Sequence, residues 1–414
     1  MNNLDMVFEG AKKASFVLST AKTKQKNDIL MQVAKAIKED MEKILSANEN
    51  DIKNARENGM SEAMIDRLSL SESKIGAIVN AIGKVIDLDD PVGKETVSTR
   101  PNGLVIKKVS VPLGVVGIIY ESRPNVTVDA ACLCLKSGNV CVLRGGKEAI
   151  NSNLAFCSSI QRALDECGFP KECVNVISDT SRDSAKALMT ANGKIDVLIP
   201  RGGKGLIQSV VENATVPVIE TGAGNCHVYV DEYANLGMAN EIAFNARAQR
   251  PSVCNSAENL LVHEKVAEKF LPMMQKKMNE KNVELRGCEK TLKILPDINA
   301  ATEEDFYTEY NDYILSVKVV KDVFEAVEHI NEHSTKHSEA IITENEENAE
   351  YFTAKIDSAA VYVNASTRFT DGEEFGLGAE IGISTQKMHA RGPMGLEALT
   401  TTKYVVQGCG QVRQ

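Results

Sequence analysis

The sequence lacks the signals that would place this chain in several broad classes of protein. No apolar run approaches the roughly twenty residues that a membrane-spanning helix needs. The first residues, Met-Asn-Asn-Leu-Asp, do not form a basic segment followed by an apolar one. There is no internal repeat and no low-complexity segment. These absences predict a cytoplasmic protein without a membrane partner.

Metal-binding signals are absent as well. No two of the ten Cys residues have the C-x-x-C spacing typical of a zinc site, and most stand in apolar stretches such as 131–134. We expect them to be small buried residues in a reducing compartment. His329, His333 and His337 recur every fourth residue, so a helix would place them on one face. This face is interpreted as solvated, and no metal is predicted.

Size and charge narrow the class further. A chain of 414 residues with 43% hydrophobic residues is expected to form more than one globular domain. The formal net charge of −10 argues against nucleic acid as a partner. A substrate that carries phosphate or carboxylate groups would therefore need a local basic pocket.

The N-terminal part of the chain, up to about residue 90, is predicted to be helical. Apolar residues such as Ile29, Val33 and Ile37 recur at three- and four-residue spacing. Ser71 is a candidate cap for a further helix.

A hairpin is predicted over residues 95–110, with its turn at Pro101-Asn102-Gly103. The segment 400–406 is rich in β-forming residues and is a candidate partner for this hairpin. Exposed hairpin edges pair readily with other chains. The sequence therefore predicts a homo-oligomer.

Strands and helices alternate through most of the remaining chain. A first series places strands at 115–120, 140–143, 174–177, 197–199 and 216–219, with helices at 127–136, 152–166, 182–191 and 204–213. A second series places strands at 228–230, 260–262, 314–319, 340–343 and 361–363, with helices at 235–247 and 264–280. Apolar strands separated by helices predict parallel sheets covered on both faces, a doubly wound α/β fold. Such sheets bind ligands at the carboxyl ends of their strands.

Two glycine-rich loops follow predicted strands of the first series. The first consists of Arg144, Gly145, Gly146 and Lys147, and the second contains Gly202 and Gly203 before a helix. Glycines permit close backbone approach, and the cations suit a phosphate. The N–H groups at the start of the second helix are candidates for binding a pyrophosphate. Neither loop is a G-x-G-x-x-G or Walker motif, but together they favour a dinucleotide site.

Cys254 differs from the other nine Cys because it stands in a polar loop, Arg-Pro-Ser-Val-Cys-Asn-Ser, at 250–256. A reactive thiol needs solvent access and nearby positive charge, which Arg247 and Arg250 are placed to supply. The residues alone leave a catalytic and a structural role open.

Five motifs now make the chain recognisable. It resembles the γ-glutamyl phosphate reductase (glutamate-5-semialdehyde dehydrogenase) family of the aldehyde dehydrogenase superfamily in the segments 112–125, 142–149, 219–227, 250–256 and 374–384. The resemblance covers essentially the whole chain. It implies a doubly wound cofactor domain, an α/β catalytic domain and a small β oligomerisation element. The NADP-binding domain is expected over 1–94 and 111–225, joined by about 365–395. The catalytic domain with Cys254 is expected over 226–364, and the oligomerisation hairpin and tail over 95–110 and 396–414.

The resemblance also implies an activity. Members of the family reduce L-glutamate 5-phosphate with NADPH to L-glutamate 5-semialdehyde and phosphate, through a thioester of the residue at position 254, in proline biosynthesis. The substrate would come from glutamate 5-kinase, with which a transient contact is an open expectation. The alternatives are an NAD(P)-dependent aldehyde dehydrogenase that oxidises an aldehyde to an acid, and an inactive scaffold that binds nucleotide.

Roles for further residues follow from the same resemblance. Asn125 and the backbone N–H of Cys254 would stabilise the oxyanion, although Asn125 is also a common turn residue. Arg144 and Lys147 would favour NADP over NAD, which the neighbouring Glu148 complicates. Glu220 aligns with the general base of the superfamily. Because water competes with hydride in a reductase, a second role, in which Glu220 only bounds the nicotinamide site, stays open.

Candidates for binding the substrate are chosen by residue type alone. An amino-acid substrate needs a cation for its α-carboxylate, and Arg123, Arg250, His389 and Arg391 are suitable. For the loop around residues 389–391, a solvated charged loop is an equally good interpretation.

Overall fold

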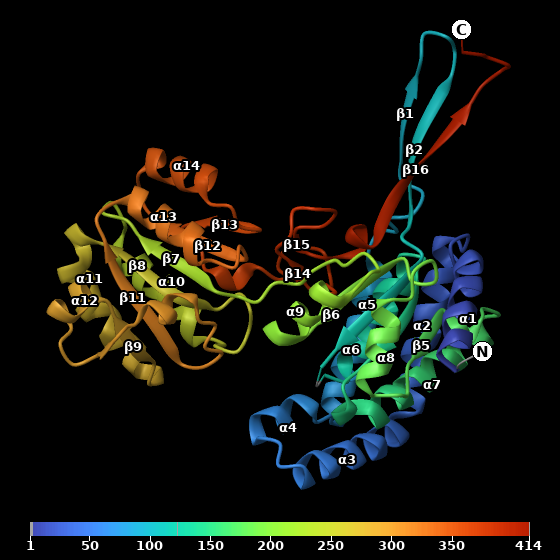
Figure 1. Ribbon diagram of the computed structural model, residues 1–414, viewed down its shortest axis with the longest axis horizontal. Helices are drawn as coiled ribbons and strands as arrows, with labels where there is room; N and C mark the ends of the chain where they lie inside the picture. The colour runs from blue at the N-terminus through green and yellow to red at the C-terminus, as the bar shows by residue number, and fades with distance from the viewer. Residues whose placement is uncertain (1–2, 122, 414) are drawn as a thin grey trace. The chain divides into compact units, whose positions relative to one another are not determined.

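The computed structural model describes residues 3–121 and 123–413 (Figure 1). The chain divides into two compact units, of which unit 1 comprises Met1–Glu220, Gly376–Gly382 and Met394–Gln414, and unit 2 comprises Thr221–Phe375 and Ile383–Pro393. The expected oligomerisation segments 95–110 and 396–414 contribute to unit 1, and the expected connection at about 365–395 contributes to both units. Residues 1, 2 and 414 of the expected boundaries lie outside the described residues. Among the described helices, none is long and apolar enough to cross a membrane.

Unit 1 begins with the predicted helical region. Its helices are α1 (Asn3–Leu18), α2 (Thr23–Glu39), α3 (Met41–Glu57), α4 (Glu62–Leu68), α5 (Glu72–Asp87), α6 (Asn125–Lys136), α7 (Ile150–Glu166), α8 (Arg182–Met189) and α9 (Lys204–Asn213). Ile29, Val33 and Ile37 share the buried face of α2, as their spacing predicts. The Ser71 side chain accepts a hydrogen bond from the backbone N–H of Lys74 and so caps α5.

A four-stranded parallel sheet forms the centre of unit 1. Its order is β5 (Val174–Val176), β4 (Val140–Arg144), β3 (Val115–Tyr120) and β6 (Val197–Arg201). The chain runs outward from β3 to β4 and β5 and then returns to the other side of β3. The strand order therefore reverses between β3 and β6, where a doubly wound sheet opens a binding crevice at its carboxyl edge.

The predicted strand over 216–219 is wrong. The segment makes only one bridge, between Leu198 and Val218. It is held by the Leu198 N–H on the Pro217 carbonyl at 2.8 Å and the Ile219 N–H on the Leu198 carbonyl at 2.9 Å. Pro217 has no N–H to donate, so a regular ladder cannot extend through it.

The predicted pairing of the C-terminal segment with the hairpin is confirmed. In the order β1 (Glu95–Thr99), β2 (Val105–Pro112) and β16 (Thr400–Gln407), all neighbours are antiparallel. Figure 1 shows β16 lying along β2 over its full length. Because β2 is central, β1 and β16 are the two edges of this three-stranded sheet.

Unit 2 is built on a seven-stranded parallel sheet. Its order is β10 (Asn299–Ala300), β9 (Glu284–Gly287), β11 (Ile314–Val320), β8 (Ala257–His263), β7 (Cys226–Val230), β12 (Ser338–Ile342) and β13 (Ala360–Val363). Its helices are α10 (Leu236–Ala248), α11 (Glu264–Met278), α12 (Glu289–Ile294), α13 (Val323–His333) and α14 (Glu346–Lys355). A small antiparallel pair, β14 (Ile383–Ser384) and β15 (Gly392–Pro393), completes the unit.

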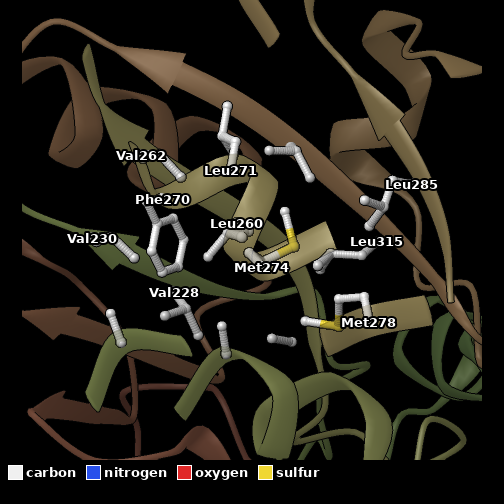
Figure 2. Packing of buried hydrophobic residues seen from close by; sticks show 14 of the residues in the cluster. Val228, Val230, Leu260, Val262, Phe270, Leu271, Met274, Met278, Leu285 and Leu315 are labelled. Atoms are coloured by element: carbon white, nitrogen blue, oxygen red, sulfur yellow. The ribbon is translucent and has the colours of Figure 1, made fainter. Parts of the chain in front are cut away.

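Alternating side chains of the long strands cover the two faces of this sheet. Val228 and Leu260 face a cluster that includes Phe270 and Met274 of α11 (Figure 2). Tyr229, Leu261 and Ile341 belong to a second cluster with α13 and α14. Side chains on a strand alternate between faces. Both faces are therefore buried, which explains the nearly continuous apolar strands.

Candidate active site

The loop that carries Cys254 connects α10 to β8 and is fixed at its end by hydrogen bonds. The Ser256 N–H donates to the Val253 carbonyl at 3.0 Å, and Ser256 Oγ donates to the Ala246 carbonyl at 3.1 Å. Cys254 is half-buried, whereas six other Cys, including Cys226, are fully buried. The residue therefore does not occupy a packed hydrocarbon core.

A second segment, before β7, packs closely against the backbone of Cys254. A Cβ atom on Gly224 would lie 1.5 Å from the Cys254 carbonyl oxygen, so only glycine fits there. Two residues later, Cys226 Sγ donates to the same carbonyl at 3.2 Å. Both segments precede their strands. Because β7 and β8 are parallel, they meet at the amino edge of the sheet, opposite to the edge that the doubly wound rule favours.

A third segment reaches this edge after β13. The side-chain amide of Asn255 donates to the carbonyls of Arg368 (3.3 Å) and Thr370 (3.0 Å), and Thr367 Oγ1 donates to the Asn255 carbonyl at 2.7 Å. Arg368 in turn donates to the side-chain oxygens of Asn255 and, at 2.9 Å, Gln249. The loop around Cys254 is thus held from three sides.

Arg247 does not provide free positive charge for this loop. It is fully buried, and its Nη1 lies 2.6 Å from Glu258 Oε2, which is also fully buried. The same nitrogen donates to the Ala257 carbonyl at 3.0 Å. Burial raises the pKa of Glu258 to about 8, against the opposing effect of Arg247. This buried pair joins the end of α10 to the start of β8.

The interpretation of the three His residues as a solvated face is wrong. His329 and His333 lie on α13 with ring centroids 3.9 Å apart, and His337 follows that helix; all three are buried. His329 and His333 lie on the side of α13 that faces the interior, where His227 packs edge-on to His329. Burial lowers the pKa of His337 to about 4. Within residues 3–121 and 123–413, no three metal-ligating side chains form a group able to hold a metal ion.

The second glycine loop of unit 1 lies at the carboxyl ends of β3 and β6, at the reversal of strand order. Here the Gly203 N–H at the start of α9 donates to Glu121 Oε2 at 2.9 Å, and the Glu121 N–H donates to the Arg201 carbonyl at 3.1 Å. A Cβ atom on Gly202 would lie 2.4 Å from the same carboxylate. The carboxylate of Glu121 thus occupies the position at this helix start that the sequence assigned to a pyrophosphate.

The first glycine loop follows β4 at the same edge. The Arg144 Nη2 atom donates to the carbonyls of Thr180 (2.6 Å) and Ser181 (2.9 Å). Its Nε is buried and has no hydrogen-bond partner among the residues that the structure describes. Lys147 is exposed and Glu148 is half-buried. An unpartnered guanidinium N–H, with an exposed lysine three residues later in the chain, fits an anionic group such as a phosphate.

Asn125 is the first residue of α6 and is half-buried. Its Nδ2 donates to Asp129 Oδ2 at 2.9 Å, one turn later in the helix. Burial raises the pKa of Asp129 to about 6, opposed by the hydrogen bond from Asn125 and the charge of Arg201. The amide of Asn125 therefore has a defined orientation in the first turn of α6.

The predicted substrate residues divide between the units. Arg123, in unit 1, is exposed, as are Arg250 and His389 in unit 2. Arg391 Nη2 lies 2.9 Å from Asp357 Oδ1. Asp357 also pairs with Lys387 at 2.9 Å and Lys336 at 3.4 Å. The hydrogen bonds from Lys387 and Arg391 hold the pKa of Asp357 well below its usual range.

Within each unit, the structure brings some of the predicted residues together. Asn125, Glu220 and both glycine loops belong to unit 1, and Cys254, Arg250, His389 and Arg391 belong to unit 2. Sequence reasoning missed Arg368, Cys226 and Asp129. Only Asp129 carried a usable signal, its position four residues after Asn125 on a helix.

The chain matches a known protein family and relatives of similar length. The aldehyde dehydrogenase family matches residues 2–307 and 306–405. The γ-glutamyl phosphate reductase of Clostridium perfringens (strain SM101) is 58% identical over 416 residues, covering 100% of both chains. That of Carboxydothermus hydrogenoformans is 59% identical over 404 residues, covering 97% of each.

A solved structure agrees. The crystal structure of γ-glutamyl phosphate reductase from Thermotoga maritima is 51% identical, covers 100% of both chains and superposes with a TM-score of 0.98. The chain therefore belongs to the aldehyde dehydrogenase family, among its γ-glutamyl phosphate reductases.

Proposed function

We propose that this protein reduces L-glutamate 5-phosphate to L-glutamate 5-semialdehyde with NADPH and releases phosphate, as a step in proline biosynthesis in the cytoplasm. The observation that carries the proposal is the half-buried Cys254 in a loop held from three sides, in a chain of this family. An oxidising aldehyde dehydrogenase is less well supported, because the relatives described above are named as reductases.

The chemistry assigns a role to each part of the site. The Cys254 thiolate attacks the acyl carbon, the C–O bond to phosphate breaks, and an enzyme thioester forms. When bound, the nicotinamide cofactor supplies the hydride that reduces the thioester to the aldehyde level. Cys254 then leaves as a thiolate and the aldehyde is released. The Asn125 amide, held by Asp129, and the Cys254 N–H are proposed to stabilise the oxyanion.

Because the acyl phosphate is labile, the test generates it in the same mixture in which the protein consumes it. Glutamate, ATP and glutamate 5-kinase are mixed with the protein, and the loss of NADPH absorbance is followed. We expect a loss that requires all components. A flat trace together with rapid NAD reduction by simple aldehydes would instead establish the alternative activity.

Comparing free kinase with kinase trapped behind a dialysis membrane tests for a transient contact between the two enzymes.

NADP(H) is proposed as the cofactor, bound by Arg144, Gly145, Gly146, Lys147, Gly202 and Gly203, with Glu220 bounding the nicotinamide. The unpartnered Arg144 Nε supports a phosphate ligand at the first loop. At the second loop, the Glu121 carboxylate would have to leave the Gly203 N–H for a pyrophosphate to bind. The expected domain boundaries, 1–94 and 111–225 for the NADP-binding domain and 226–364 for the catalytic domain, are part of this proposal.

Changing one charge at the first loop should alter the choice of cofactor. Lys147→Gln is expected to weaken NADPH binding about tenfold and leave NADH binding nearly unchanged, since only NADPH carries the 2′-phosphate. Glu148→Gln is the matched control and should tighten NADPH binding, because it removes a neighbouring negative charge. Fluorescence titration with each nucleotide measures both. Equal effects on the two nucleotides would contradict the assignment.

For the substrate, Arg250 and His389 are proposed, and both are exposed. Arg391 is also proposed, although Asp357 already pairs with it. Lys387 and Lys336 share the same carboxylate, so this cluster carries an excess of positive charge. Arg123 is proposed as a further candidate from unit 1.

We also propose that the protein is a homo-oligomer. The edge strands β1 and β16 expose apolar side chains, with Val97 at 50%, Tyr404 at 66% and Val406 at 55% exposure. Gel filtration is expected to show a species larger than the 45.0 kDa monomer. Val406→Lys should reduce its size, because a charge on an edge strand opposes pairing. Phe16→Lys, also at an exposed apolar residue, should not. A monomer at micromolar concentration would contradict the proposal.

A further inference from the structure

The guanidinium of Arg368 is directed at the loop that carries Cys254. Arg368 lies on a short 3₁₀ turn, η5 (Thr367–Phe369), and is half-buried. Its Nη1 donates to the side-chain oxygen of Asn255, the residue after Cys254, and its Nε donates to Gln249 Oε1 at 2.9 Å. The cation is therefore anchored on both sides of Cys254 in the loop.

The backbone of the same turn reinforces this placement. The Asn255 amide donates to the Arg368 carbonyl at 3.3 Å, and Thr367 Oγ1 donates to the Asn255 carbonyl at 2.7 Å. Side chain and backbone thus bind Asn255 in both directions. A guanidinium with this many fixed contacts is pre-organised, and a lysine could not reproduce its planar fork.

Electrostatic interactions connect Arg368 with the thiol. Burial lowers the pKa of Arg368, the charge of Arg250 lowers it further, and negative charge on Cys254 opposes this decrease. The half-buried Arg368 and the exposed Arg250 repel each other, and negative charge on Cys254 relieves that repulsion. Asp371 and Cys226 also act electrostatically on Arg368, and Glu339 and Glu258 act on Cys226.

Arg368 is better placed than Arg247 to supply positive charge near the thiol. A reactive thiol needs nearby positive charge. Arg247 is fully buried, and its Nη1 pairs with Glu258 Oε2 at 2.6 Å. Arg250 is exposed, so solvent screens it more strongly. Arg368 combines partial burial with a fixed orientation toward the loop.

We propose that Arg368 is a positioning residue for the nucleophile: it fixes the loop over 249–255 and supplies the positive charge that keeps the Cys254 sulfur ionised. This inference rests on the proposed role of Cys254. Arg368 acts through the thiol and is not assigned a contact with the substrate.

The test measures ionisation of the thiol without turnover. The protein is alkylated with iodoacetamide across a range of pH, and modification of the Cys254 peptide is quantified by mass spectrometry. Cys409, which is exposed on the C-terminal tail, is an internal reference in the same digest. In the unmodified protein, the inflection for Cys254 should lie at lower pH than that for Cys409.

Three variants separate charge from geometry. Arg368→Gln should raise the Cys254 inflection by about one pH unit, which lowers its alkylation rate at neutral pH up to about tenfold. Arg368→Lys keeps the charge and should shift it less. Gln249→Ala removes only the bond to Nε and should also shift it less. Lys293→Gln, an exposed charge on α12, is the matched control and should leave it unchanged.

Two results would overturn the proposal. One is an Arg368→Gln profile that superimposes on the wild-type profile while circular dichroism shows a folded protein. The other needs no variant, and so decides the matter even if Arg368→Gln fails to fold: a wild-type Cys254 inflection at or above that of Cys409. If the alkylation results are as expected but no NADPH is consumed in the kinase-coupled assay, the proposed function fails and the inference about Arg368 stands.

Discussion

Cys254→Ser is expected to reduce turnover in the kinase-coupled assay by about 10³-fold or more while NADPH still binds. A serine hydroxyl has the same shape but is almost never ionised at neutral pH, so the attack on the acyl phosphate loses its nucleophile. The backbone contacts of the residue, such as the Cys226 Sγ donor on its carbonyl at 3.2 Å, are retained. Stopped assays give the turnover and fluorescence titration gives the NADPH affinity.

The matched control is Cys409→Ser, which removes an exposed thiol from the C-terminal tail. It should retain wild-type turnover. A Cys254→Ser variant that retained substantial turnover would show that no covalent thioester forms. One that lost NADPH binding as well would indicate damage to the cofactor site and not loss of the nucleophile.

Above the pKa of Glu258, at about pH 9, Arg247→Met is expected to lower the free energy of unfolding by about 3–5 kcal/mol, the largest effect on stability that we predict. The substitution keeps the volume of the side chain but leaves the fully buried Glu258 without its cation. It also removes the hydrogen bond to the Ala257 carbonyl at the start of β8. Urea denaturation followed by circular dichroism measures the change.

The pH dependence of this effect has a defined sign. Because burial raises the pKa of Glu258 to about 8, the folded protein holds this proton more tightly than the unfolded chain does. The contribution of such a group to stability is complete at low pH and is lost as the pH rises through the folded-state pKa. Loss of Arg247 should raise that pKa further, so the destabilisation should be greatest at alkaline pH.

Two further variants check this explanation. Lys293→Met breaks an exposed ion pair with Glu289 and should leave the urea midpoint of unfolding almost unchanged. The double variant Arg247→Met with Glu258→Leu should recover most of the lost stability, because an apolar pair of similar size replaces a buried charge pair at little cost. If the single variant unfolded at the wild-type midpoint, the pair would not anchor the loop that holds Cys254.

Local patterns in the sequence predicted most of the fold. The helix that contains Ile29 and Val33, the cap at Ser71 and the pairing of 400–406 with the hairpin are confirmed because each depends on spacing or on turn chemistry. The prediction of a strand over 216–219 was wrong because Pro217 has no N–H for a regular ladder, although its neighbours are apolar. Strands β9 and β10 were not predicted because they are short and partly polar.

The candidate site was less predictable for a physical reason. The motif around Cys254 is visible in the sequence, but its surroundings come from segments that meet only because parallel strands align their amino ends. Neither the Gly224 backbone nor the Arg368 side chain is near Cys254 in sequence, yet both contact its loop. The buried state of His329 likewise depends on how α13 packs, which spacing alone does not reveal.

The course of the chain through unit 1 has a consequence for biosynthesis. This unit takes its last segments, Gly376–Gly382 and Met394–Gln414, from the end of the chain, while unit 2 is drawn almost entirely from Thr221–Phe375. A ribosome therefore synthesises both segments of unit 2 before the segment Met394–Gln414 of unit 1. Domains fold as units during translation. Unit 2 can therefore fold while one edge of β2 is still unpaired, because β16 has not yet emerged. If copies of the protein assemble through that sheet, as proposed above, the complete sheet is available to them only after β16 has emerged.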